Sequence, residues 1–136
     1  MDRVFLDANV LFSAAYHSSS RFSEFWSLPD LELVTSHLAY EEARRNLLYH
    51  RPKAISHLNT LMESVSIQSE TDCLPYLPEG IDLAEKDIHI LAGAIHAVCT
   101  HLVTGDNRHF GHLFGCTIKG VTVMMPVEYL DARLNK

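Results

Sequence analysis

Four acidic side chains occur in the sequence where a folded chain could bring them together. Asp7 directly follows the apolar run 4–6, and Asp106 follows a second strand-like run, 102–104, with one glycine between. Glu42 and Asp87 stand in the first or second turn of segments with helical periodicity. In an open parallel sheet the functional crevice lies beyond the carboxyl ends of the strands, so acids at two strand ends can face each other. We therefore expect all four carboxylates to converge at one edge of a sheet.

Carboxylates gathered in this way require a cation. Like charges about 4 Å apart in a partly buried site repel each other by several kcal/mol. Mg²⁺ prefers oxygen ligands, keeps several waters, and binds one or two protein carboxylates together with substrate phosphate oxygens. One or two such ions can polarise a phosphodiester, activate water and stabilise the leaving oxygen. The pattern thus predicts phosphodiester hydrolysis with Mg²⁺ or Mn²⁺.

Each acid also has an ordinary structural alternative. Asp7 could begin a turn and Asp87 could cap its helix. Glu42 could be half of a solvated pair with Glu41, and Asp106 could belong to loop chemistry. For any single acid the ordinary role is favoured, because isolated motif matches are common. Only their joint placement favours a metal site.

The elements that must position these acids alternate in type. Five short apolar runs are typical of strands, namely residues 3–6, 31–35, 65–67, 101–104 and 121–125. Helices are predicted from five starting points, Ser20, Ser36, Pro52, Asp87 and Pro126. Residues 68–80 are polar and contain two prolines, which is typical of a long surface loop. The alternation predicts an α/β fold built from βαβ units around a five-stranded, mainly parallel sheet.

Length and composition favour one domain over residues 1–136. The chain is 47% hydrophobic and 21% charged, which suffices for a core and a solvated surface. The longest apolar candidate for a membrane span, 90–99, is short and carries His96. The first residues lack the length and cleavage site of a secretory signal. The three cysteines are an odd number without close pairing, so we predict a protein of the reducing cytoplasm. They are Cys73, Cys99 and Cys116. We predict no association with a membrane.

The net charge of −6 argues against a nucleic-acid partner at first sight, because phosphate binding needs Lys and Arg. Four carboxylates assigned to one metal site account for most of that charge, and bound divalent ions would neutralise them. Basic residues are partly clustered near one predicted helix, although ordinary solvated charges are the favoured explanation for each one alone. They are Arg44, Arg45, Arg51 and Lys53, with Arg108 beside a candidate site residue.

Four segments carry a resemblance to a known family. FLDANVLFSA, YEEARRNLL, LAEKDIHILAGAI and HLVTGDNRHFG, in this order and over most of the chain, resemble the PIN-domain ribonucleases, including VapC-type toxins. The resemblance implies a three-layer α/β/α fold with a five-stranded parallel sheet, Mg²⁺ or Mn²⁺ as cofactor, and cleavage of RNA. It maps the family's acids to positions of this chain, and these are Asp7, Glu42, Asp87 and Asp106.

The same resemblance assigns neighbouring residues. Asn9 matches a polar residue two positions after the first acid, and Thr104 a small hydroxyl residue before the last one. Glu42 is chosen over the adjacent Glu41 because its spacing from Ser36 fits the family better. Some relatives carry a further acid after the last motif. In this chain that region instead reads Asn107, Arg108 and His109, which we assign to substrate binding together with Asn9 and Thr104.

Histidine and arginine leave alternatives open. Nine histidines invite a zinc site around His109, His112 and Cys116, but the paired Cys or His spacing of zinc sites is absent. His109 could contact phosphate, carry a proton, or be an ordinary hydrogen-bonded loop histidine. Arg108 could bind phosphate through its forked guanidinium, or be an exposed loop arginine.

Three functions follow from these residues. The first is a metal-dependent endoribonuclease, either a toxin neutralised by an antitoxin protein or an RNA-processing enzyme, with a homodimer common among similar proteins. The second is a non-catalytic PIN-like RNA-binding or scaffold module that retains the acidic pocket. The third, a phosphotransfer enzyme with Asp7 as nucleophile, lacks a second acid two residues later, where Asn9 stands.

Overall fold

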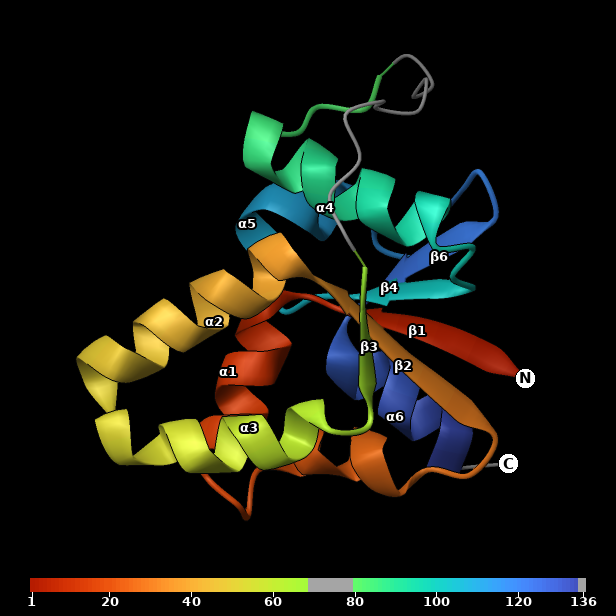
Figure 1. Ribbon diagram of the computed structural model, residues 1–136. Helices are drawn as coiled ribbons and strands as arrows, with labels where there is room; N and C mark the ends of the chain where they lie inside the picture. Colours follow the sequence, from red (N-terminus) through yellow and green to blue (C-terminus); the bar gives the residue numbers. More distant parts are fainter. Residues whose placement is uncertain (69–79, 135–136) are drawn as a thin grey trace.

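The strands of the protein form one six-stranded sheet, seen in the computed structural model that describes residues 1–68 and 80–134 (Figure 1). The strand order is β3-β2-β1-β4-β6-β5, and every neighbouring pair is parallel except β5 and β6. The mainly parallel α/β sheet predicted from the sequence is confirmed. The strands are β1 (Asp2–Leu6), β2 (Leu31–Ser36), β3 (Val65–Gln68), β4 (His101–Val103), β5 (Thr117–Ile118) and β6 (Val121–Met124).

The sixth strand, β5, corrects the predicted count of five. It pairs antiparallel with β6 across a tight turn in which Lys119 (φ 48°) and Gly120 (φ 89°) both have positive φ. Positive φ at both central residues suits the twist of a two-residue hairpin. Two residues are too short to show an alternating pattern, so no strand was predicted here.

Helices cover both faces of the sheet. Figure 1 shows α4 over one face and α1, α3 and α6 against the other, which confirms the three-layer arrangement. No helix within residues 1–68 and 80–134 is both long and apolar enough to cross a membrane. The helices are α1 (Ala8–Tyr16), α2 (His37–His50), α3 (Ile55–Met62), α4 (Glu85–His96), α5 (Asn107–Phe110) and α6 (Pro126–Leu134), with 3₁₀ segments η1 (Arg21–Ser27), η2 (Pro52–Ala54) and η3 (Gly111–Leu113).

Helix α1 was not predicted. Its sequence, ANVLFSAAY, is apolar on most sides, and five of its nine residues are buried, so no polar face marks a helical period. The helix predicted from Ser20 is the short 3₁₀ segment η1, capped by that serine. The start predicted at Asp87 is two residues late, because α4 begins at Glu85. Residues 69–79 of the predicted loop 68–80 lie outside the described residues, and Gln68 ends β3.

The crossover between β1 and β4 determines where a site can form. From β1 the chain adds β2 and β3 on one side, then crosses to add β4 and β6 on the other. Leu6 of β1 lies opposite Val103 of β4, and the Asp7 amide donates to the Val103 carbonyl at 3.2 Å. The residues that follow both strands therefore emerge side by side, at the point where the strand order reverses.

Ser36 begins the helix that carries Glu42, as the sequence predicted. Its backbone is extended, and its Oγ accepts a hydrogen bond from the Ala39 amide at 3.1 Å. We expect Ser36→Ala to lower the free energy of unfolding by about 1 kcal/mol and Ser36→Gly by only a few tenths, the order typical of N-cap positions. Urea denaturation of the three proteins measures this. A glycine variant less stable than the alanine variant would show instead that packing of the buried Ser36 Cβ dominates.

Candidate metal centre

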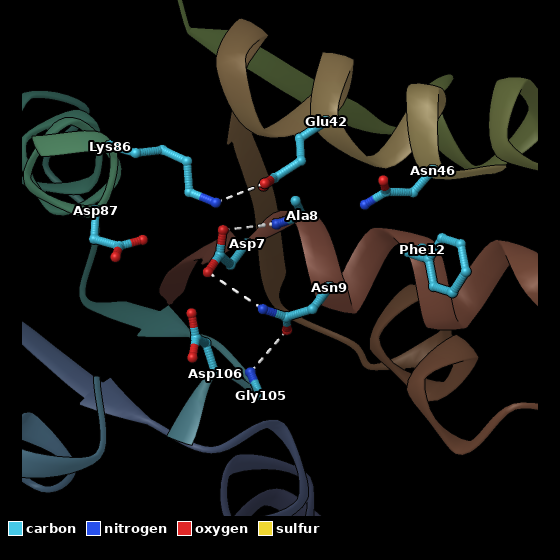
Figure 2. Close-up of a pocket in the computed structure, with 10 residues that line it drawn as sticks. All are labelled: Asp7, Ala8, Asn9, Phe12, Glu42, Asn46, Lys86, Asp87, Gly105 and Asp106. Atoms are coloured by element: carbon cyan, nitrogen blue, oxygen red, sulfur yellow. Dashed lines mark hydrogen bonds and ion pairs between the residues drawn. The ribbon is translucent and has the colours of Figure 1, made fainter. Parts of the chain in front are cut away.

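A cleft of about 320 Å³ opens at the carboxyl ends of β1 and β4. All four predicted acids line it, and they come from four different segments of the chain (Figure 2). The acids follow β1, lie on α2 and α4, and follow β4. The lining residues are Asp7, Ala8, Asn9, Phe12, Glu42, Asn46, Lys86, Asp87, Gly105 and Asp106.

Asp7 is the most firmly held of the acids. It is 5% exposed and caps α1, with Oδ1 accepting from the Ala8 amide at 2.7 Å and Oδ2 accepting from the Thr104 hydroxyl at 2.7 Å. Burial raises the pKa of Asp7 to about 6, against the lowering effect of these two hydrogen bonds, and the charges of Glu42 and Asp87 raise it further. The side chain is thus a rigid carboxylate whose charge the folded protein disfavours.

Asn9 and Thr104 form hydrogen bonds with other groups of the protein at the edge of the cleft. The Asn9 Oδ1 accepts from the Gly105 amide at 2.7 Å, and its Nδ2 lies 3.2 Å from the Thr104 hydroxyl. The Asp106 amide also donates to that hydroxyl, at 3.1 Å. A Cβ on Gly105 would lie 3.2 Å from the Asn9 Oδ1, so glycine allows this close approach. These bonds join the end of β1 to the end of β4.

Glu42 meets a cation that the sequence did not single out. The Lys86 Nζ donates to the Glu42 Oε1 at 2.6 Å, and this hydrogen bond raises the pKa of Lys86 (Figure 2). Glu41 does not line the cleft and lies 3.9 Å from Arg44. Lys86 was not predicted because the metal-site pattern is one of acids, although the position of Lys86 directly before Asp87 could have identified it.

Asp87 is the acid with the least compensation. It is 2% exposed, and within the described residues its buried Oδ2 has no hydrogen-bond partner. Burial raises the pKa of Asp87. A buried carboxylate oxygen without a donor is costly, and such groups in proteins usually meet a cation or a water.

Asp106 is paired with His109 in the following helix. Its Oδ1 accepts from the His109 amide at 3.1 Å, and its Oδ2 lies 2.7 Å from the His109 Nδ1. Burial opposes ionisation, but the hydrogen bonds from His109 outweigh it and lower the pKa of Asp106. The same Nδ1 lies 3.6 Å from the Asp87 Oδ2, so His109 stands between two of the acids.

Other predicted residues lie farther from the cleft. Asn107 and Arg108 are exposed and do not line it. Arg108 borders a separate hollow with Asp82, Ala84, His109 and His112. Within the described residues, one group of acidic, histidine or cysteine side chains has ligand atoms within 4.8 Å of one another, and it comprises Asp87, Asp106 and His109. His112 and Cys116, the centre of the zinc alternative, belong to no such group in the part of the chain that the structure describes.

Two further lining residues were not predicted. Asn46 lies four residues after Glu42 on α2, so the spacing of one helix face could have identified it. Phe12 lies on α1, and it was missed together with that helix. Both form part of the cleft wall, on the side away from Asp106 in Figure 2.

The donor set fits a hard divalent cation. Carboxylate oxygens predominate, one of them buried and unpartnered, and mutual repulsion contributes to the raised pKa of Asp7. Oxygen ligands at one cleft are what Mg²⁺ and Mn²⁺ bind in proteins. Asp7, Glu42, Asp87 and Asp106 are the residues that could hold such an ion, directly or through water.

Three solved structures share this fold. The first, VapBC2 from Rickettsia felis bound to a promoter DNA fragment, has a chain that matches with a TM-score of 0.68 and 14% identity, covering 90% of this chain and 98% of the other. VapBC-1 from nontypeable Haemophilus influenzae matches with a TM-score of 0.59 and 17% identity over 92% and 98% of the two chains. VapC20 from Mycobacterium tuberculosis, described as a toxin that cleaves the Sarcin-Ricin loop, matches with a TM-score of 0.56 and 11% identity over 73% and 86%.

The likeness is structural rather than one of sequence. No family model and no curated protein matches the amino-acid sequence. At identities of 11% to 17% the three matches establish the fold. The resemblance stated from the four sequence segments is confirmed at this level, and the chain has the fold of the VapC-type PIN-domain proteins.

Proposed function

We propose that this protein is a metal-dependent endoribonuclease that hydrolyses RNA phosphodiester bonds. The observation that carries the proposal is the meeting of four carboxylates in one cleft, one of which, Asp87, has a buried oxygen with no hydrogen-bond partner among residues 1–68 and 80–134. A purely structural cluster would be expected to satisfy each buried oxygen with a donor from the chain. Here the arrangement retains an acceptor that calls for a cation.

The cleft's own residues divide the work. Asp7 is held by Ala8 and Thr104, so it is preorganised and loses no side-chain freedom when a cation binds. When bound, a divalent ion supplies positive charge that polarises the phosphodiester and activates water. Lys86 and Asn46 line the cleft with side-chain N–H groups that can donate hydrogen bonds to phosphate oxygens. The chain thus orients both the acidic site and the phosphate.

The toxin role is a narrower part of the proposal. VapC20, which shares the fold, is described as a toxin that cleaves the Sarcin-Ricin loop, and two other matches are VapBC structures. By this likeness we infer that RNA is the substrate and that an antitoxin protein is a partner. The free thiols of Cys99 and Cys116 support action in the reducing cytoplasm.

One observation favours a second candidate, a non-catalytic RNA-binding or scaffold module. Lys86 already pairs with Glu42 and supplies positive charge inside the acidic cleft. A module that only binds RNA could use this cation alone. Such a protein would bind RNA and release no product with any divalent ion.

RNA cleavage assays on variants of Asp106 and of the neighbouring Glu42 and Glu41 test the proposed nuclease activity. We expect wild type to cleave mixed RNAs with Mn²⁺ and to be inactive with EDTA. Asp106→Asn and Glu42→Gln should lower the rate by about 100-fold or more, since even outer-shell changes at metal sites cost about 10- to 100-fold. Glu41→Gln is the matched control, because Glu41 lies on the same helix but outside the cleft. Full activity in the Asp106 variant, or RNA binding by wild type without product, would reject the nuclease.

The raised pKa of Asp7 predicts a pH dependence of stability without metal. An Asp with a folded pKa of about 6 and an unfolded value near 3.8 binds more protons when folded, so its destabilising effect is absent below about pH 4 and complete above about pH 6. That shift corresponds to roughly 2–3 kcal/mol. In EDTA, wild type should therefore lose stability relative to Asp7→Asn as pH rises from 4 to 7. Urea denaturation across pH measures the difference, and parallel profiles would contradict the assignment.

Expression in a bacterial host tests the toxin role. Wild type should arrest growth because it depletes an essential RNA, and Asp106→Asn should not. Co-expression of a small DNA-binding protein encoded immediately upstream, where one exists, should restore growth. Normal growth with folded, RNA-cleaving wild type present would favour RNA processing over a toxin, and would leave the nuclease itself in place.

A further inference from the structure

We propose that His109 is a nitrogen ligand of this metal centre and that the centre consequently selects first-row transition ions such as Mn²⁺ over Mg²⁺. The inference rests on the proposed metal-dependent function and narrows it to a class of cofactor. The acids alone do not make this distinction, because carboxylates accept both ions. His109 can make it, because imidazole nitrogen suits transition metals better than Mg²⁺.

The positions of three ligand atoms support a shared ion. The His109 Nδ1 lies 2.7 Å from the Asp106 Oδ2 and 3.6 Å from the Asp87 Oδ2. Ligand atoms from all three residues lie within 4.8 Å of one another. Two atoms bound to one octahedral ion at about 2.1 Å lie about 3 Å apart when adjacent and about 4.2 Å apart when opposite. The 3.6 Å separation falls in this range, and the 2.7 Å separation is slightly shorter than that of an adjacent pair, so a small shift of either side chain would admit one ion.

Asp87 provides an independent sign that a ligand belongs at this place. Its carboxylate is 2% exposed and lines the cleft, and its Oδ2 has no hydrogen-bond partner within the described residues. Asp7, Glu42 and Asp106 each accept a hydrogen bond from the chain. The unmet acceptor is thus the one that faces the His109 Nδ1, at a distance too long for a strong hydrogen bond.

The backbone of His109 holds the imidazole in position, and an ion would take the place of the proton between the His109 Nδ1 and the Asp106 Oδ2. Its amide donates to the Asp106 Oδ1 at 3.1 Å, which closes the first turn of α5. The side chain is 43% exposed, so an ion can reach it from the cleft rim. A neutral imidazole with its proton on Nε2 presents the Nδ1 lone pair to a cation. Asp106 and His109 can then bind one ion as neighbours.

Metal affinities of the full-length protein test the inference without measuring catalysis. Mn²⁺ binding is followed by the electron paramagnetic resonance signal of the free ion, and Mg²⁺ affinity by competition with Mn²⁺. Wild type should prefer Mn²⁺, and His109→Asp, which replaces nitrogen with an oxygen ligand, should reduce the ratio of Mn²⁺ to Mg²⁺ affinity by about tenfold. His112→Gln is the matched control, because His112 lies in the neighbouring hollow outside the three-residue group. Its ratio should equal that of wild type.

A spectroscopic readout distinguishes a ligand from a residue that only orients Asp106. Electron spin echo measurements on the Mn²⁺ complex should show modulation by a directly bound ¹⁴N in wild type and in His112→Gln, and none in His109→Asp. Binding of both ions with an unchanged affinity ratio, or wild-type Mn²⁺ without nitrogen modulation, would overturn the His109 inference and leave the nuclease proposal intact. Failure of wild type to bind either ion would overturn the metal-dependent function itself.

Discussion

Electrostatic repulsion among four carboxylates is the constraint on which the rest of this structure depends. The four acids differ in how far hydrogen bonds from the chain offset this repulsion. Asp7 receives three hydrogen bonds from the chain, the longest from the Asn9 Nδ2 at 3.4 Å. Asp106 is paired with His109, and Glu42 is paired with Lys86. Asp87 is the most buried of the four and receives none within the described residues. Hydrogen-bond donors from the chain therefore stabilise the charges of three acids. Asp87 has no such donor within the described residues, so a cation would stabilise this acid most.

Parallel pairing of β1 with β4 brings two of these acids, Asp7 and Asp106, to the same edge of the sheet. The two strands are adjacent although the paired residues Val4 and His101 are 97 positions apart in the sequence, so acids that are distant in sequence emerge at one edge. Asn9, Thr104 and Gly105 then join the two strand ends by hydrogen bonds. Such a network resists separation of the like charges, because moving one strand end would break several bonds at once. The sheet supplies the position, and the polar network supplies the rigidity.

Local patterns in the sequence were sufficient for the strands, the capped helix α2 and the placement of the four acids, since each depends on residues close together along the chain. They were insufficient for α1, whose buried surface extends around most of the helix, and for β5, which is only two residues long. Lys86 and His109 show a different limit. Their types were visible, but the contacts with Glu42 and with two aspartates depend on how α4 and α5 pack at the strand ends. Tertiary distances of this kind leave no periodic signal.

The low sequence identity of the structural matches separates fold from chemistry. An α/β sheet with a crossover at β1 and β4 tolerates most substitutions that keep apolar faces, whereas the chemistry depends on a few polar atoms at one edge. In this chain those atoms include two cationic or ionisable groups, Lys86 and His109, that contact the acids directly. Lys86 is paired with Glu42, and His109 is paired with Asp106. Under the proposed metal-dependent function, the identity of these partner groups, rather than the sheet, would therefore determine how strongly the site attracts a cation and which cation it prefers.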